Sequence, residues 1–600
     1  MRKALLVLAA LAAAPLLSAG LTADQKELEL RTLAAQYAKH YAPYEWKREL
    51  FGFDLYNLAP WIARARATAT DLDYYQVCGE YVASLQDSHS SYGIYSSFRA
   101  SLPVHADYYE NVPRIDFINR TALPAADFPF QIGDEIVSVD GVPIAEAVER
   151  NGKTVYSANN SARRRTALQR LFSTSETSNA RAALIGDELA FVIRSRTTGE
   201  EATYRIPVTK FGQSLAEGGV TPSPAFKSAA AAPLVTAAAA HAPLAAAARP
   251  GVPAPRAAHA AQSSAERVTT ELLAPWLAPL APLASDVAHA EPWGDAHEEA
   301  FDVLGFGARP GFVLPPGFTV RLGRFSGDPY FSGTYTAGGK RIGFIRIATF
   351  SPSISATAAL AAFETEMTFF NANTDGLIVD VMRNSGGSAC YNEEIQRRVI
   401  PYAFRGIGRE IRASRGWVQS FHTAWQSAMA AGLPPHVIAL AEANYRDIAR
   451  ANSELRGRTG PLPICAETLD RLPHATAYRK PLIVLADEYS ASAADAFPAV
   501  LQDAARGPIF GFRTNGAGGT IGSWETGPYS EANSSATIAM HHRRAPVNNP
   551  GYPSTHYVEN AGVYPDLPYD YMSLDNLLQA GIPFRDAVTE AILQEIERKQ

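Results

Sequence analysis

A serine turn between an apolar segment and a helix is the part of this chain best suited to chemistry. Residues 481–488 read PLIVLADE, a strand-like run, and residues 493–507 read AADAFPAVLQDAARG, which predicts a helix. The turn YSAS between them places Ser490 and Ser492 near a helix N-terminus. There the free backbone N–H groups and the helix dipole favour negative charge, such as a tetrahedral oxyanion. The alternative is that both serines are ordinary turn or N-cap residues.

A glycine pair supplies the second chemical motif. The segment GLIVDVMRNSGGS (376–388) is a buried-strand pattern that runs into Gly386 and Gly387. Glycines allow the backbone to approach a ligand closely and to present its N–H groups. If the two strand ends meet, a serine nucleophile would lie beside an oxyanion hole.

Together the two motifs resemble those of a serine peptidase family. This family includes the tail-specific proteases, the tricorn protease core and the chlamydial protease-like activity factor. The resemblance continues through GFRTNGAGGTIG (511–522) and YVENAGVYPDL (557–567), and covers roughly residues 339–570. It implies an α/β protease core of the crotonase-like type, and the pattern is most similar to the branch of the chlamydial factor.

One departure from the family decides the nucleophile and the kind of base. Tail-specific members carry a lysine base where this chain has Ala517. The family's spacing, counted back from Ala517, falls on Ser492, so we take Ser492 rather than Ser490 as the nucleophile. Because a serine hydroxyl is a poor nucleophile without a base, the missing lysine points to a histidine.

His89 is the predicted base. It lies in ASLQDSHSSYG (83–93), where a helical pattern ends in Asp-Ser-His, similar to the N-terminal Asp-x-His of the histidine-using branch. Ser88 either orients the imidazole ring or is an ordinary helix-end residue, and we favour the second interpretation. Of the other histidines, His541 and His542 lie beside two arginines and are expected to be exposed, while His556 is a rival base.

Glu559 is the predicted third group of the site. The resemblance places a glutamate here, and a carboxylate that accepts from the imidazole fixes its tautomer and stabilises the imidazolium. The alternative is a loop glutamate before a glycine turn. The oxyanion would be held by the backbone N–H of Ala493 and of Gly386 or Gly387.

The start of the chain indicates export, and the cysteines limit its disulfides. Residues 1–20 combine two basic residues, an apolar run and small residues, which is typical of a signal peptide. Export would place the protein in the periplasm or outside the cell, and no later run of about 20 apolar residues predicts a membrane span. The three cysteines, Cys78, Cys390 and Cys465, permit at most one internal disulfide, and we expect Cys390 to serve packing rather than catalysis.

Composition and patterning predict several domains. The chain has 600 residues, 47% of them hydrophobic, and a net charge of −6. We expect a multidomain α/β and α+β protein, since residues 130–150 resemble part of a PDZ domain, a module that binds peptides by strand addition. The expected parts are a signal peptide (1–20), an N-terminal helical region carrying the base (21–96), a PDZ-like domain (97–212), an Ala/Pro-rich flexible insert (213–292) and the α/β protease core (293–600).

These features favour an exported serine endopeptidase that cleaves extended or unfolded protein segments through Ser492, His89 and Glu559. No metal site or cofactor is indicated, and nucleic acid is not an expected partner, because metal-ligand clusters and basic stripes are missing from the sequence. The sequence leaves open whether the chain forms a homo-oligomer. The insert is either a passive linker or a segment whose cleavage activates the enzyme. The alternative function is a catalytically silent peptide- or ligand-binding protein on the same fold.

Overall fold

The computed structural model describes most of the chain, in several stretches. The described residues are 20–94, 96–215, 312–323, 328–352, 354–463, 465–466, 468–527, 529–530 and 532–599. The predicted signal peptide up to residue 19, and all but the first three residues of the predicted insert, lie outside them. None of the described helices is both long enough and apolar enough to span a membrane.

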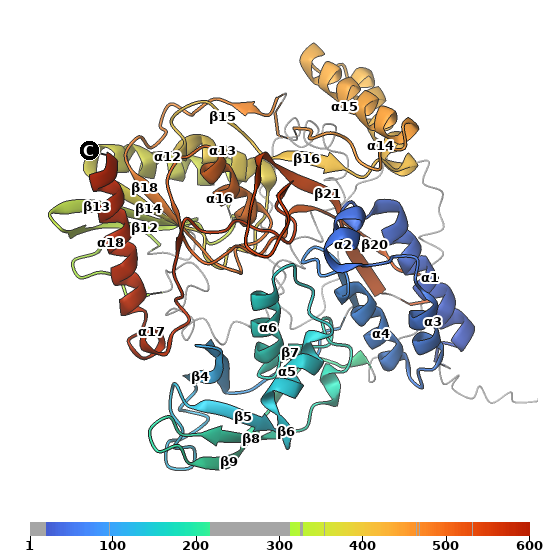
Figure 1. The fold of residues 1–600 in the computed structure, drawn as a ribbon, viewed down its shortest axis with the longest axis vertical. Helices are drawn as coiled ribbons and strands as arrows, with labels where there is room; N and C mark the ends of the chain where they lie inside the picture. The colour runs from blue at the N-terminus through green and yellow to red at the C-terminus, as the bar shows by residue number, and fades with distance from the viewer. Residues whose placement is uncertain are drawn as a thin grey trace, which may run out of the picture.

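Four helices form the N-terminal region, which Figure 1 shows in blue. The first begins after Thr22, whose hydroxyl accepts from the backbone N–H of Gln25 while the Gln25 side chain bonds back to Thr22. Thr70 caps the fourth through its hydroxyl, which accepts from the Asp73 backbone N–H and donates to the Asp73 carboxylate. Tyrosines and leucines from these helices pack into one core. The helices are α1 (Ala23–His40), α2 (Tyr44–Phe51), α3 (Ala59–Arg66) and α4 (Asp71–Ala83).

A mainly antiparallel domain follows, in the position predicted for a PDZ-like module. Its six-stranded sheet has the order β3-β4-β5-β8-β9, with β6 paired to β5, and helices α5 and α6 pack on it. The sheet elements are β3 (Val104–Tyr109), β4 (Val112–Ile118), β5 (Glu135–Val139), β6 (Val142–Pro143), α5 (Ile144–Gly152), α6 (Asn160–Gln169), β8 (Glu188–Arg194) and β9 (Glu201–Pro207). A smaller sheet joins β2 (Arg99–Ser101), β7 (Ser173–Ser175) and β10 (Thr209–Phe211), beside the short helix η1 (Ala182–Leu184).

The C-terminal core is built on a seven-stranded sheet with the order β11-β12-β13-β14-β18-β19-β23. From β13 to β23 the strands are parallel, and β14, β18 and β19 are fully buried, as expected for strands covered on both faces. Because their carboxyl ends meet at one edge, the loops that follow β14 and β18 become neighbours. The strands are β11 (Thr319–Leu322), β12 (Phe331–Ala337), β13 (Lys340–Arg346), β14 (Gly376–Asp380), β18 (Leu482–Ala486), β19 (Ile509–Gly511) and β23 (Leu567–Pro568).

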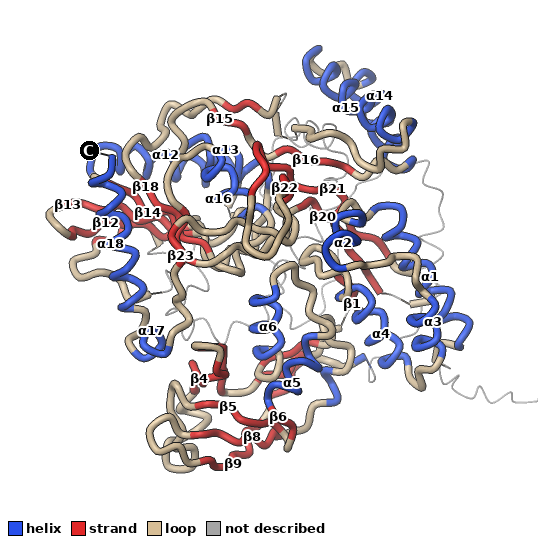
Figure 2. The backbone as a smooth tube through the Cα atoms, in the orientation of Figure 1, coloured by secondary structure: helices blue, strands red, loops and turns tan. Residues whose placement is uncertain are grey.

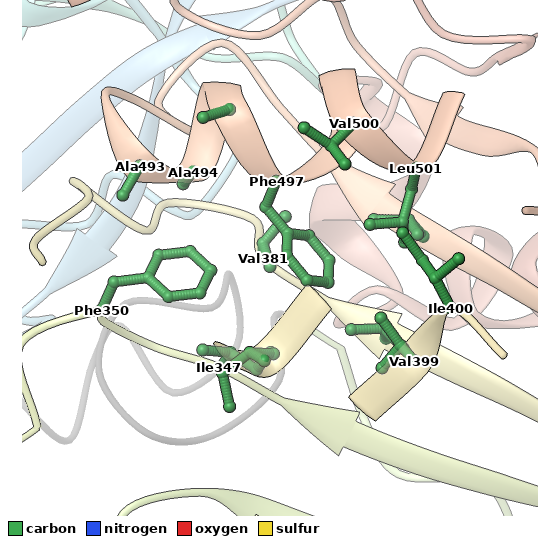
Figure 3. Packing of buried hydrophobic residues seen from close by; sticks show 14 of the residues in the cluster. Ile347, Phe350, Val381, Val399, Ile400, Ala493, Ala494, Phe497, Val500 and Leu501 are labelled. Carbon is green, nitrogen blue, oxygen red and sulfur yellow. The ribbon is translucent and has the colours of Figure 1, made fainter. Parts of the chain in front are cut away.

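Helices cover both faces of this sheet (Figure 2). Residues of α12, α13 and α16 form one core with the sheet, part of which Figure 3 shows around Phe350 and Phe497. Residues of α18 form the core on the other face. The helices are α12 (Ala356–Asn373), α13 (Ala389–Val399), α16 (Ala493–Asp503), α17 (Leu574–Leu578) and α18 (Ile582–Lys599).

A five-stranded sheet links the two ends of the chain. The long strand β21 pairs with all four other strands in an antiparallel sense, and its pairing with β1 joins Ser91 to Ser535. The strands are β1 (Ser91–Ile94), β16 (Gly408–Ile411), β20 (Gly519–Glu525), β21 (Ala532–Val547) and β22 (Thr555–Tyr557). Between β16 and β18 lie the helix pair α14 (Arg415–Ala430) and α15 (Pro435–Ser453), and the strand β17 (Asp470–Arg471), which pairs with β15 (Phe404–Arg405).

The described architecture confirms the predicted multidomain class, with an antiparallel PDZ-like sheet and an α/β core. It also contains a disulfide, between Cys390 and Cys465, which joins the start of α13 to the loop after α15. Cys78 is buried and free.

Candidate active site

Ser492 occupies a strained position at the start of α16. Its backbone has a φ of +57° and a ψ of −112°, a conformation that costs free energy for a residue with a side chain. Strand β18 ends six residues earlier, so the chain turns sharply from strand to helix at this serine. Ser490 is fully buried, and its hydroxyl bonds to the Val381 carbonyl and the Asp487 carboxylate. Ser490 is therefore part of the structure of the turn, and Ser492 is the serine that it presents.

The Gly-Gly loop after β14 lies against this turn. A Cβ atom added to Gly386 would stand 2.7 Å from Cβ of Ser492 and 3.0 Å from the backbone nitrogen of Ala493, so only glycine allows this approach. The Gly386 N–H already donates to the side-chain oxygen of Asn384, at 2.8 Å. The N–H groups of Gly387 and Ala493 have no protein acceptor among the described residues.

Asp495 joins the nucleophile turn to the turn of residues 514–518. Its buried carboxylate accepts from the backbone N–H groups of Ser492, Gly516 and Ala517, at 2.8–2.9 Å, and from the Thr514 hydroxyl. Burial outweighs the lowering effect of these hydrogen bonds, so the pKa of Asp495 is raised to about 6. The sequence analysis missed this residue, although an acid three residues after a helix-start serine is a recognisable capping signature.

The loop carrying His89 reaches the same turn from the other side. Ser88 donates to the Asn515 side chain at 2.5 Å, and accepts from the Ala158 N–H. The His89 N–H bonds to Asp87, and its carbonyl accepts from Ser535 on β21. His89 Nδ1 is buried with no partner in the described part of the chain. Burial lowers the pKa of His89, Asp87 raises it, and Lys47 lowers it.

Glu559 also lies at this turn, but not with the predicted partner. One carboxylate oxygen accepts from the Gly518 N–H at 3.0 Å, and the other is paired with Lys47 at 2.6 Å. The expected hydrogen bond from His89 to Glu559 is not formed; the two carboxylate oxygens accept from Lys47 and from Gly518 instead. Burial raises the pKa of Glu559, as does the nearby Asp87, whereas Lys47 and the Gly518 N–H lower it. Lys47 and Asp87 were both absent from the predicted site.

The other histidines differ from the sequence-based expectation in two cases, because neither His541 nor His542 is exposed. The prediction that His541 is exposed is wrong: it is 3% exposed, because β21 runs through the middle of the five-stranded sheet. The His541 backbone N–H donates to the Gly518 carbonyl, and its imidazole Nδ1 has no partner among the described residues. His542 is partly buried and stacks on His556, whose Nδ1 faces the Arg543 carbonyl. His556, the rival base, thus contacts the Arg543 carbonyl through Nδ1 and stacks on His542.

The structure therefore gathers the predicted groups around the turn of residues 514–518 without joining them directly. Ser492 reaches it through Asp495, His89 through Ser88, and Glu559 through Gly518. Over the described residues, no hydrogen bond links Ser492 to His89. Within those residues, no cluster of side chains has the composition of a metal site. Because Cys390 is in a disulfide, it is not a thiol nucleophile.

Comparisons with known proteins agree with this geometry. Residues 341–568 match the model of peptidase family S41, and residues 99–207 match a PDZ domain model. A protein of Chlamydia pneumoniae is 24% identical over 554 residues, which cover 84% of this chain and 81% of that protein. A protein of Chlamydia trachomatis serovar D is 24% identical over 598 residues, which cover 93% and 90%.

A solved structure shows the same fold over nearly the whole length. Mature CPAF aligns with a TM-score of 0.68 and 19% identity, covering 96% of this chain and 98% of that one. CPAF has also been solved in complex with lactacystin. The predicted resemblance to the tail-specific and chlamydial-factor peptidases is thereby confirmed, and its peptidase part is the match over residues 341–568.

Proposed function

We propose, from the premise that residues 341–568 form a peptidase domain of family S41, that this protein is an exported serine endopeptidase acting on extended or unfolded protein segments. The observation that carries the proposal is the strained Ser492, held at the start of α16 against the Gly-Gly loop. A nucleophile on a strand-to-helix turn is exposed to substrate while its backbone N–H groups face the developing charge.

In the proposed reaction, Ser492 Oγ attacks the scissile carbonyl and His89 takes the hydroxyl proton. The N–H groups of Ala493 and Gly387 hold the oxyanion, since the Gly386 N–H is already engaged by Asn384. His89 then gives its proton to the leaving amine, and a water molecule hydrolyses the acyl-enzyme with His89 again as base. Asp87 and Glu559 supply the negative charge that stabilises the imidazolium.

Two further features support the finer parts of the proposal. The PDZ match at residues 99–207 suits a protease that holds its substrate as an added strand. The disulfide between Cys390 and Cys465 suits an oxidising compartment, as export to the periplasm or beyond would provide.

The experiment is labelling with a fluorophosphonate, which modifies activated serines, combined with cleavage of an unfolded protein substrate. We expect label on Ser492 and cleavage that the label blocks. Label on Ser490, or cleavage that survives complete labelling, would contradict the assignment.

A catalytically silent binding protein is the second candidate, and one observation favours it. The described residues contain no hydrogen bond between Ser492 and His89, so the structure shows no preformed nucleophile–base pair. Peptide binding without labelling or cleavage would establish this alternative.

A further inference from the structure

Lys47 is a buried lysine beside the site, outside both matched domains. It lies on α2, its side chain is 0% exposed, and 512 residues separate it from its partner Glu559. A charged lysine is almost never fully buried unless it is paired, because desolvating the ammonium costs several kcal/mol. Its position therefore needs a reason beyond the packing of α2.

All three donors of the Lys47 ammonium are used. They go to Glu559 Oε1 at 2.6 Å, to the Asn560 side-chain oxygen at 2.6 Å, and to the Gln86 carbonyl at 2.8 Å. The Trp46 indole N–H next to it donates to the Glu559 carbonyl at 2.9 Å. Helix α2 thus holds the Glu559 loop with two consecutive residues.

The two loops that Lys47 joins are both strained. Gln86 has a φ of +51° and Asn560 a φ of +60°, in the left-handed region that residues with side chains rarely occupy. Gln86 lies three residues before His89, and Asn560 directly follows Glu559. Such conformations persist only where the surroundings impose them, and the shared ammonium is one of the contacts that do so here.

Several ionisable groups face this ion pair. When both are ionised, Asp87 and Glu559 carry two negative charges, and Lys47 offsets one. With a neutral imidazole the cluster keeps one net negative charge, which suits the imidazolium formed during acyl transfer. The ionisable groups facing Glu559 or His89 are Tyr41, Lys47, Asp87 and His541.

We propose that Lys47 is a positioning residue for catalysis, which acts through Glu559 by holding its carboxylate as an anion and fixing it beside the His89 loop. The inference rests on the proposed serine-peptidase function. Lys47 touches neither substrate nor nucleophile in this scheme. Without the ammonium, burial would favour the protonated form of Glu559, and the charge available to the imidazolium would be lost.

The test is the Lys47→Met variant of the full chain, which removes the charge and keeps most of the side-chain volume. We expect kcat at pH 7 to fall by about 100-fold with KM changed less than about threefold. Since Glu559 must then ionise without a cation, the acid limb of the pH–rate profile should move up by about one pH unit or more. The inference would be overturned if the pH–rate profile of Lys47→Met had the wild-type shape, or if this variant were more active than wild type.

Lys26→Met is the matched control. Lys26 is also buried in the N-terminal helices, 3% exposed, but it bonds to the Thr68 carbonyl and lies 3.7 Å from Asp71, away from the site. We expect this variant to lower the melting temperature without moving the pH profile. If the acid limb of the pH–rate profile moved up as far in Lys26→Met as in Lys47→Met, the loss of either buried lysine would be acting through the fold. That result would also overturn the inference.

A second comparison decides the case in which Lys47→Met does not fold. The double variant Lys47→Met/Glu559→Gln removes both charges of the ion pair, so neither is left buried alone, and it is compared with Glu559→Gln alone. A kcat within about threefold of Glu559→Gln supports action through Glu559, whereas a further loss of about tenfold overturns it. The proposed function has its own test: it fails if Ser492→Ala cleaves substrate as well as wild type. The Lys47 and Glu559 variants test only the role of Lys47, so the two failures can be told apart.

Discussion

Around Ser492 a single carboxylate, that of Asp495, holds the backbone through three N–H groups, whereas around His89 two imidazole nitrogens lie buried without a partner in the described residues. The nucleophile half is preorganised by hydrogen bonds that join the Ser492 turn to the turn of residues 514–518. The base half, with Nδ1 of His89 and of His541 unpaired, keeps hydrogen-bonding capacity unused. Catalytic hydrogen bonds often tighten only when substrate binds, so the two halves are expected to respond differently to mutation.

The largest effect should come from the serine pair. Ser492→Ala is expected to lower kcat/KM by at least about 1,000-fold, because the nucleophile is lost, with the free energy of unfolding nearly unchanged. Ser490→Ala should do the opposite, since it removes buried bonds to Val381 and Asp487 and costs about 1–2 kcal/mol of stability. Cleavage assays and denaturant unfolding measure the two quantities. Equal loss of activity in both variants would contradict this division of roles.

The histidine pair should show the next largest effect. His89→Ala is expected to lower turnover by about 1,000-fold, as members of a catalytic unit fail together. Burial lowers the pKa of His89, so its neutral form persists to lower pH than that of an ordinary imidazole, and protonation of His89 should not limit wild-type activity at neutral pH.

His541→Ala is the matched comparison for this prediction. It removes a buried imidazole on β21 and should mainly reduce stability. A pH–rate profile that rises only above about pH 9 would indicate a lysine base instead of His89.

Gly386→Ala tests whether the nucleophile half is as rigid as its contacts indicate. The added Cβ would lie 2.7 Å from Cβ of Ser492 and 2.8 Å from the Ala491 carbonyl, at a φ of +105° that disfavours alanine. Because neither neighbour is a flexible side-chain end, we expect kcat to fall by about 10–100-fold with smaller changes in KM. Unchanged kinetics would show that this turn yields more readily than its hydrogen bonds suggest.

The disulfide gives the smallest expected effect on activity. Replacing Cys390 and Cys465 by serine should lower the free energy of unfolding by about 2–4 kcal/mol, as expected for a bridge that closes a 75-residue separation. Turnover at 25 °C should change less than about threefold, because Asp495 and the Gly-Gly loop hold Ser492 independently of it. If the folded double-serine variant lost much of its turnover, the disulfide would be needed to hold Ser492 in position, which contradicts this prediction.

The contrast between the halves also explains what the sequence predicted. Ser492, Gly386 and Gly387 were found because each lies in a local strand–loop pattern that resembles a known family, and the choice of Ser492 over Ser490, the α/β core and the PDZ-like class came from that resemblance. Lys47 was missed because nothing local marks it: only the folded chain brings it 2.6 Å from Glu559. His541 was misplaced because adjacent arginines suggested a surface, whereas one of them, Arg543, is itself buried in a pair with Asp503.

The pairing of β1 with β21 has a consequence for the order in which the protein is made. Ser91 and Ser535 face each other across a sequence separation of 444 residues, and non-local pairs of this kind form late. Domains fold as the chain emerges from the ribosome, N-terminal parts first. A growing chain therefore completes the PDZ-like domain long before β21 exists to receive the strand after His89. Under the proposed function, proteolysis begins only once synthesis is almost finished.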